Sequence, residues 1–232
     1  MIYGYEDIIT LTLAFIGFVI TLVAQLGING TYQKYKRIQN SKRITGQEVA
    51  RKILDENGLN HIHVVEVKGE LSDHYDPSNQ VVRLSTDIYH GDTVAAMAVA
   101  AHECGHAIQD KVNYRFMIIR SKLVPFVNLV SYLGYFTVIV SLIAGITGYL
   151  MIGILTILAT LVFQLVTLPV EFDASKRALK ELQKYQIPNN NEIDGATSML
   201  KAAAFTYVAS VISSIMSLLR LIIMLLNNRK DD

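Results

Sequence analysis

Two histidines and a glutamate in the segment AVAAHECGHAIQD (residues 98–110) have the spacing of a metal-binding catalytic helix. Residues four apart lie on one face of an α-helix, so His102 and His106 can direct ring nitrogens at a single ion. Glu103 lies beside the first histidine, where it can take a proton from a metal-bound water whose pKa has fallen toward about 7. The motif predicts Zn²⁺-dependent hydrolysis of peptide bonds with Glu103 as general base.

The alternative interpretation is a chance motif on an alanine-rich packing helix. Such a helix would bury three polar side chains among apolar neighbours, which costs several kcal/mol unless the groups are paired. We therefore favour the metal site, with Gly105 and the alanines allowing another segment to approach closely. Cys104 is the only cysteine, which excludes an intramolecular disulfide and a Cys-rich zinc knuckle. We interpret it as a small packing residue.

A catalytic zinc site usually has three protein ligands and one open position. No histidine follows His106, so the third ligand is a later carboxylate or an upstream residue. The candidates are His61, His63, His74, His90, Glu171, Asp173 and Asp194. An apolar hairpin after the motif returns the chain to the same side of a membrane just before Glu171, which favours Glu171.

The composition, 51% hydrophobic and 18% charged, is typical of a membrane protein. We expect a mainly α integral membrane protein with about four transmembrane helices and a small α+β zincin-like catalytic region that contains a β-hairpin. The expected spans are residues 8–26, 124–143, 149–170 and 205–226. Residues 144–148, AGITG, join the second and third. Arg220 interrupts the fourth, which can span, tilt or lie partly at the interface.

Basic residues near the span ends predict the orientation. They gather in residues 34–43, 111–122 and 176–184, all on one side if the first three spans are real. We expect that side to be cytoplasmic in a bacterial cell membrane, with the active site on it. The acidic start MIYGYED and the lack of a cleavage motif indicate an uncleaved anchor. Arg229 and Lys230 fit less well, because four full spans place them outside.

The polar segments predict a short series of elements. A helix over 45–56 is expected after a cap at Thr45 or Ser41, and a β-hairpin is expected from strands 61–67 and 80–85. The later helices are expected from Val94 after a cap at Asp92 or Thr93, over 171–183, and from Asp194 or Gly195.

The resulting division of the chain has five parts. They are an N-terminal anchor (1–30), a cytoplasmic metalloprotease region (31–122), a transmembrane hairpin (123–170), a cytoplasmic helix with the third ligand (171–203) and a C-terminal transmembrane or interfacial helix (204–232).

Four segments together resemble a known family. AHECGH, followed by EFDASKRAL after the apolar hairpin, and flanked by GELSDHYDPSNQVVRLS and LKAAAFTYVAS, is similar to the YugP-like membrane neutral zinc metallopeptidases, over about residues 60 to 210. HtpX-type and CaaX-processing proteases, with H-E-x-x-H and E-x-x-x-D, are more distantly similar. The resemblance implies a gluzincin-like set of ligands, His102, His106 and Glu171, with Glu103 as base.

One position departs from the more distant pattern. Ser175 stands where an aspartate would support a metal histidine. Asp173 is two residues from Glu171 and therefore about 200° around a helix, off the ligand face. Ser175 can accept a ring N–H more weakly, or another group can do so.

Substrate contacts are predicted from the segment before the motif. The strand QVVRLS (80–85) is a candidate exposed edge that can pair with an extended peptide. His74, with Tyr75 beside it, can donate to the oxyanion that forms during hydrolysis, although a turn explains the same residues. Arg177 can serve the same role or anchor the span at lipid headgroups.

Other functions are weighed against the protease. A site-2-type intramembrane protease would use Asp194 of Asp-Gly as third ligand, but its surroundings PNNNEIDG are polar. A non-catalytic zinc-binding scaffold would have no need for Glu103. The net charge of +1 is too small to indicate a basic surface that binds nucleic acid. Expected partners are protein or peptide substrates, among them membrane proteins in quality control, and the lipid bilayer. An adaptor and the oligomeric state are left open.

Overall fold

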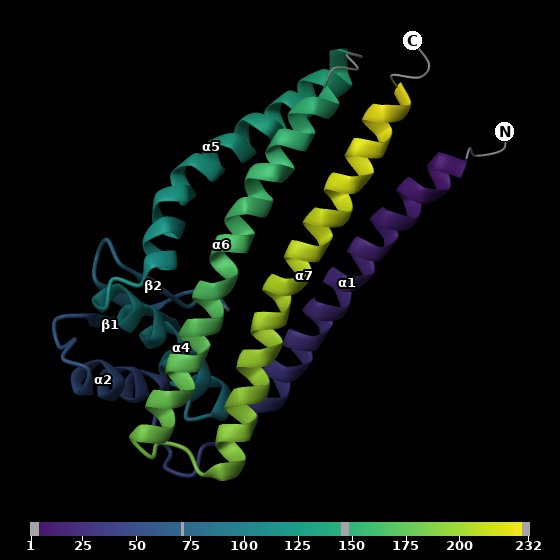
Figure 1. Ribbon diagram of the computed structural model, residues 1–232. Coiled ribbons are helices and arrows are strands. Elements are labelled where there is room, and N and C mark those ends of the chain that lie inside the picture. Colours follow the sequence, from purple (N-terminus) through teal and green to yellow (C-terminus); the bar gives the residue numbers. More distant parts are fainter. Residues whose placement is uncertain (1–4, 71, 145–148, 229–232) are drawn as a thin grey trace. The chain divides into compact units, whose positions relative to one another are not determined.

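Long helices dominate the computed structural model, which describes residues 5–70, 72–144 and 149–228 (Figure 1). The four longest are α1 (Tyr5–Tyr35), α5 (Arg115–Ala144), α6 (Tyr149–Lys184) and α7 (Asn190–Asn228). Each holds a stretch long and apolar enough to cross a membrane, so the expected mainly α chain with four candidate spans is confirmed. Most of the AGITG turn, and Arg229 and Lys230, lie outside the described residues.

Two of the predicted helix boundaries are wrong. The helix expected separately over 171–183 is the end of α6, which continues through Pro169. The last helix begins at Asn190, earlier than expected, because Asn189 and Glu192 cap it reciprocally. The Asn189 side chain accepts from the Glu192 amide at 3.0 Å, and the Glu192 carboxylate accepts from the Asn189 amide at 2.9 Å. Arg220 does not interrupt α7.

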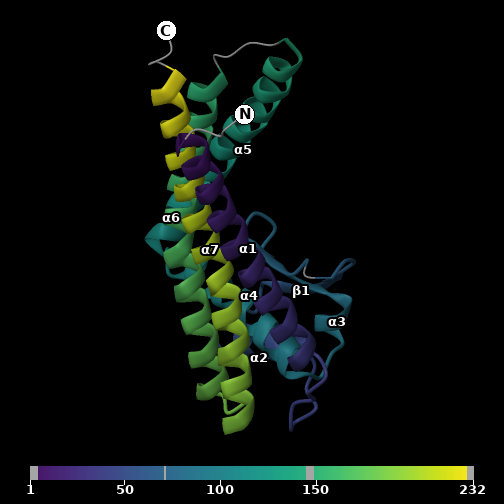
Figure 2. The ribbon, with the colours of Figure 1, turned by 90° about the vertical axis from the view of Figure 1, so that its right-hand side faces the viewer.

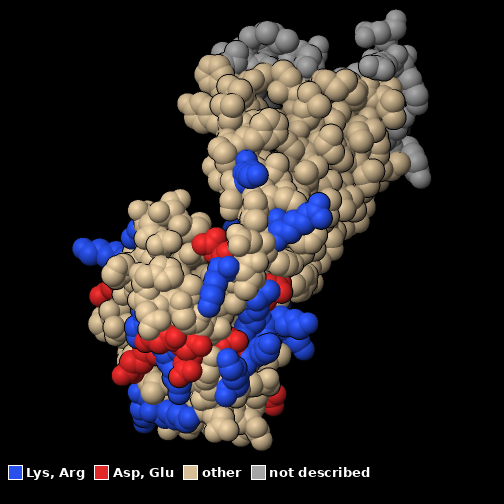
Figure 3. Space-filling view, turned by 60° about the vertical axis from the view of Figure 1, so that its left-hand side comes forward, with Lys and Arg blue, Asp and Glu red and all other residues tan. Residues whose placement is uncertain are grey.

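The chain forms two compact units. The span unit comprises Met1–Gln25, Ile119–Leu168 and Thr206–Asp232, and the sheet unit comprises Leu26–Ile118 and Pro169–Phe205. In Figure 3, charged side chains crowd the surface of the sheet unit, whereas few are visible on the span unit. An apolar surface on long helices is what a bilayer covers.

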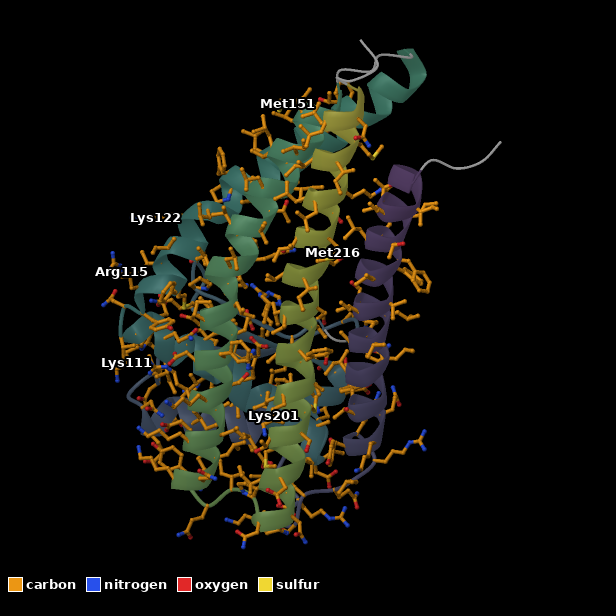
Figure 4. The ribbon with its side chains drawn as sticks, turned by 45° about the vertical axis from the view of Figure 1, so that its right-hand side comes forward. Lys111, Arg115, Lys122, Met151, Lys201 and Met216 are labelled. Carbon is orange, nitrogen blue, oxygen red and sulfur yellow. The ribbon has the colours of Figure 1, made fainter. Side chains whose placement is uncertain are left out.

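Small residues bring the helices of the span unit together. α1 and α7 lie side by side (Figures 1 and 2), where a Cβ atom on Gly17 would be 3.3 Å from Oγ of Ser213 and 3.6 Å from Cβ of Met216. Met216 is labelled on α7 in Figure 4. Gly134 on α5 faces Thr156 on α6 in the same way. Close backbone approach at small residues is how helices associate in lipid.

The sheet unit contains two short helices, three strands and α4. Its elements are α2 (Gly46–Glu56), β1 (His63–Val67), β2 (His74–Asp76), β3 (Val81–Ser85), α3 (Thr86–Tyr89) and α4 (Val94–Lys111), together with the ends of the long helices. The expected caps are confirmed. Thr45 forms a capping box with Glu48, and Thr93 accepts from the amide of Ala96 at 3.1 Å.

The predicted pairing of the strands is wrong, although a hairpin is present. β3 lies in the middle of the sheet, parallel to β1 and antiparallel to β2. The prediction missed β2 because its three residues stand inside a turn-rich segment. Asp76 accepts from the amides of Ser78 and Asn79 at 3.0 and 3.2 Å, which closes the β2–β3 hairpin. QVVRLS is therefore not an exposed edge, and the edges belong to β1 and β2.

Helix α4 is buried on almost all sides. It packs against α2, whose Val49, Ala50, Ile53 and Leu54 are fully buried. The alanines of α4 from Ala95 to Ala107 are all fully buried as well. An alanine-rich helix can be enclosed in this way because its neighbours approach its backbone closely. The few polar side chains on α4 are therefore held by specific partners.

Candidate metal centre

Three side chains from two helices converge in the sheet unit. His102 and His106 lie one turn apart on α4, and Glu171 lies on α6. Their ligand atoms all lie within 4.8 Å of one another. Oε2 of Glu171 is 3.3 Å from Nε2 of His102 and 3.6 Å from Nε2 of His106. The structure thus brings together the three residues named as metal ligands from the sequence.

Glycine at position 105 makes this convergence possible. A Cβ atom there would lie 2.5 Å from the backbone oxygen of Ala174 and 3.1 Å from its carbonyl carbon. Real Cβ contacts are not that short, so α6 could not approach α4 at this level if position 105 carried a side chain. The sequence predicted a close approach at Gly105, and α6 is the segment that makes it.

Glu103 lies beside the ligands and is almost completely buried. Its Oε2 accepts a hydrogen bond from the backbone amide of Tyr75, on β2, at 2.9 Å. Burial raises the pKa of Glu103 to about 7, and the negative charge of Glu171 acts in the same direction, while His102 opposes them. A carboxylate with a pKa near neutrality can both accept and return a proton.

The side chain of Tyr75 makes a second contact with α4. Its hydroxyl donates to Oδ2 of Asp110 at 2.9 Å, while its amide donates to Glu103. Because Glu103 and Asp110 are seven residues apart on α4, the two bonds hold β2 along that helix. Hence β2 is the edge strand that adjoins Glu103.

Each metal histidine has a partner at its other ring nitrogen. Nδ1 of His102 lies 3.3 Å from Oγ of Ser175, the weaker acceptor considered from the sequence. Nδ1 of His106 lies 3.0 Å from Oε1 of Gln109. Sequence reasoning missed Gln109. The available signal was its spacing, three residues after His106, which places it on the same face of the helix.

Asp173 and Arg177 extend the network around Gln109. Oδ2 of Asp173 accepts from Nε2 of Gln109 at 2.9 Å and from Nε of Arg177 at 2.5 Å. The guanidinium of Arg177 lies 5.9 Å from the centre of the Tyr114 ring. Asp173 is off the ligand face of α6, as expected, and reaches His106 only through Gln109.

A family model described as "Putative neutral zinc metallopeptidase" matches residues 10–226. The chain belongs to this family. A curated relative, "Putative membrane protease YugP" of Bacillus subtilis (strain 168), is 40% identical over 224 residues, which cover 97% of this chain and 99% of the relative. No solved structure matches significantly. The family resemblance seen in the sequence is thus confirmed.

Membership of a zinc peptidase family implies zinc, and the three converging residues fit it. Two imidazole nitrogens and one carboxylate oxygen are ligands that zinc takes in catalytic sites. Ligands at about 2 Å from one ion lie up to about 4 Å apart, so the set needs only a small closure. Each histidine also has a partner at Nδ1, which leaves Nε2 to face Glu171.

The other candidate ligands lie outside this group. His61, His63 and His74 are exposed, His90 is 3.2 Å from Glu66, and Asp194 is exposed on the first turns of α7. The position of Asp194 therefore gives no support to the site-2-type arrangement. His74 lies next to Tyr75 on β2, with Nδ1 2.8 Å from the backbone oxygen of Ser72.

Cys104 packs in the core, as interpreted from the sequence. Its side chain is fully buried, and its sulfur lies 3.6 Å from the backbone oxygen of Ala50 on α2. Burial raises the pKa of its thiol, with the nearby Glu103 acting in the same direction. The thiol is therefore a small apolar filler between two helices, next to the ligands and not one of them.

Proposed function

We propose that this protein is a membrane-embedded zinc-dependent endopeptidase. His102, His106 and Glu171 would hold the ion, and Glu103 would be the general base. The observation that carries the proposal is the convergence of three ligand atoms within 4.8 Å, next to a buried carboxylate on the same helix. A structural zinc site has no need for such a base and usually closes all four positions with protein groups.

The chemistry follows from the placement of Glu103. A bound zinc ion would polarise the substrate carbonyl and lower the pKa of a water molecule toward about 7. Glu103 would accept the proton of the attacking water and pass it to the departing amine. The amide of Tyr75 would orient the carboxylate for this transfer, and the burial of Glu103 would make it a better proton acceptor.

The substrate would lie as an extended chain along β2. This edge strand replaces QVVRLS as the candidate, because β3 is paired on both sides and β2 adjoins Glu103. His74 lies on the same strand and would donate to the oxyanion. His74→Ala is expected to lower kcat by about 10²–10³-fold and to leave zinc binding unchanged.

Membrane proteins are the proposed substrate class. Glu171 follows residues 150–170, an uncharged stretch of α6. Roughly 20 helical residues cross the hydrocarbon core, so Glu171 would lie at the membrane surface. Lys111 and Arg115, which flank the turn between α4 and α5 (Figure 4), and the later basic group of α6 favour a cytoplasmic location. Quality control of membrane proteins in a bacterial cell is the role proposed.

Zinc content and proteolysis of purified protein test the proposal. Wild type in detergent is expected to bind about one zinc ion and to cleave an unfolded membrane-protein substrate. Glu103→Gln is expected to keep the zinc and lose cleavage by at least about 100-fold. Glu171→Gln is expected to lose zinc affinity. Glu56→Gln, an exposed glutamate on α2, is the matched control.

Each assignment fails on a separate outcome. Cleavage that survives in Glu103→Gln would exclude it as the base, and wild-type zinc affinity in Glu171→Gln would exclude it as a ligand. Zinc binding without cleavage of any membrane or soluble substrate would favour the scaffold. Loss of zinc in Asp194→Asn would favour the site-2-type arrangement.

A further inference from the structure

Gln109 is a fully buried polar side chain that contacts both helices of the metal centre. Its Oε1 lies 3.0 Å from Nδ1 of His106, on its own helix α4. Its Nε2 donates to the backbone oxygen of Val170 at 2.8 Å and to Oδ2 of Asp173 at 2.9 Å, both on α6. A buried amide with every partner in place is held in one orientation.

The two acceptors on α6 decide which way the amide faces. Both Val170 and Asp173 offer oxygen atoms that can only accept, so the NH₂ group of Gln109 must face them. The amide oxygen is therefore directed at His106, where it can only accept. It follows that Nδ1 of His106 carries a proton, and Nε2 is the ring nitrogen that faces Oε2 of Glu171, at 3.6 Å.

We propose that Gln109 is a positioning residue that selects this tautomer of His106 and ties α4 to α6 at the level of the ligands. The inference rests on the proposed metal site and adds a residue that holds it in shape. A ligand imidazole with the wrong tautomer would present a proton to the metal. By accepting a hydrogen bond from Nδ1 of His106, Gln109 keeps a proton on that nitrogen before any metal binds.

The proposal accounts for the arrangement of charges behind His106. Gln109 links the two side chains, since its Oε1 contacts Nδ1 of His106 and its Nε2 donates to Oδ2 of Asp173. Nε of Arg177 donates to the same carboxylate oxygen of Asp173 at 2.5 Å. The corresponding contact at His102, between its Nδ1 and Oγ of Ser175, is longer, at 3.3 Å. His106 is therefore the more firmly oriented of the two ligands.

Two measurements test the role of Gln109. Ring ¹⁵N NMR of metal-free protein reads the tautomer of His106, and a chelator competition reads zinc affinity. In wild type we expect Nδ1 of His106 to be protonated. Gln109→Met is expected to give a mixture of tautomers and to weaken zinc binding by about 10–100-fold. Gln183→Met, at an exposed site on α6, is the matched control and should behave as wild type.

The outcomes separate this inference from the proposed function. A wild type that binds no zinc but keeps Nδ1 of His106 protonated would defeat the metal site and support the role of Gln109. Zinc binding in Gln109→Met within twofold of wild type, or a mixed tautomer in wild type, would overturn the proposal. If Gln109→Met does not fold, Gln109→Glu keeps an acceptor for His106. A mixed tautomer in folded Gln109→Glu would overturn it too.

Discussion

Gly105 and Gly134 each lie against a neighbouring helix, but Gly105 faces backbone atoms and Gly134 faces a side chain. In the sheet unit, a Cβ atom on Gly105 would lie 2.5 Å from the backbone oxygen of Ala174. In the span unit, a Cβ atom on Gly134 would lie 2.4 Å from Oγ1 of Thr156. The distances are nearly equal. A helix backbone, however, moves only with the whole helix, whereas a threonine side chain can change its rotamer.

The difference between a backbone contact and a side-chain contact indicates a different role for each glycine. At Gly105 the approach of two backbones sets the distance between His102 and His106 on α4 and Glu171 on α6, so any separation acts on the proposed metal site. At Gly134 the contact holds one membrane helix against another, and the side chain can adjust. The contact at the proposed metal site, between Gly105 and Ala174, is the one that cannot relax by a change of side-chain rotamer.

Gly105→Ala is expected to have the largest effect. The added methyl must push α6 away from α4, and overpacking of this kind costs about 1–3 kcal/mol. Because the ligands come from both helices, we also expect zinc affinity to fall. Denaturant unfolding in detergent and chelator competition measure the two effects.

Gly27→Ala is the matched control for this substitution. Gly27 is a helical glycine of α1, also in the sheet unit, and a Cβ atom there would meet nothing within 4 Å. We expect unchanged zinc affinity and a gain of up to about 1 kcal/mol from helix propensity. Wild-type zinc affinity in Gly105→Ala would contradict the view that this contact sets the ligand distance.

Tyr75→Phe tests the other contact that holds α4, and its effect is expected to be smaller. It removes the bond from the hydroxyl to Asp110 and keeps the amide that bonds Glu103. Hydrogen bonds to charged groups contribute about 1.5–3 kcal/mol, so the unfolding free energy should fall toward the lower end of that range. Zinc affinity should not change, and cleavage should fall less than about tenfold. The control is Tyr89→Phe, at a half-buried tyrosine outside the site. An equal fall in its unfolding free energy would show that the bond from Tyr75 to Asp110 has no particular importance.

Composition and periodicity were enough to predict the spans and the motif helix. The spans are long apolar stretches, and α4 begins after Thr93 as expected, because both depend on neighbouring residues in the chain. Caps are local as well, so Thr45 was found. The error at 171–183 arose because α6 continues through Pro169 without a break. The error at 189–191 arose because the cap formed by Asn189 and Glu192 lies in a segment that was interpreted as a polar loop.

The features that depend on contacts between residues far apart in the sequence were only partly predicted. β2 is too short to show a pattern, and its pairing with β3 depends on the turn at Asp76. Gln109 and Tyr75 bond atoms of other elements, including a backbone oxygen at Val170 that leaves no mark in the sequence. The convergence of Glu171 with His102 and His106 was predicted because the expected membrane hairpin, and the family resemblance, restricted where a third ligand could come from.

Gly134→Ala is the direct counterpart of Gly105→Ala and should have a small effect. The new Cβ would lie 2.4 Å from Oγ1, 2.8 Å from Cγ2 and 3.1 Å from Cβ of Thr156. Thr156, whose Oγ1 donates to the backbone oxygen of Ile152 at 2.9 Å, would have to rotate, and α5 would have to shift slightly. A strained rotamer costs about 0.5–1.5 kcal/mol, and the gain in helix propensity offsets about 1 kcal/mol of it. We expect stability within about 1 kcal/mol of wild type and unchanged zinc affinity. Adding Thr156→Ala should remove the remaining loss, and a double variant no better than Gly134→Ala alone would contradict a contact with that side chain.

The smallest effect is expected at Asp73, where the fold holds a carboxyl group between the strands β2 and β3. It accepts from the amide of Ser85 at 2.7 Å, but burial raises its pKa above the ordinary value of 3.8. The native state therefore keeps this proton to higher pH than the unfolded chain does, and the unfolding free energy falls as pH rises from 3.8 through the raised pKa. Asp73→Asn keeps an acceptor oxygen without the charge, so its stability relative to wild type should improve as pH rises across that window. Unfolding at about pH 4 and about pH 7 measures the change. Equal differences at the two pH values would show that burial of the charge at Asp73 does not limit the stability of this corner of the sheet.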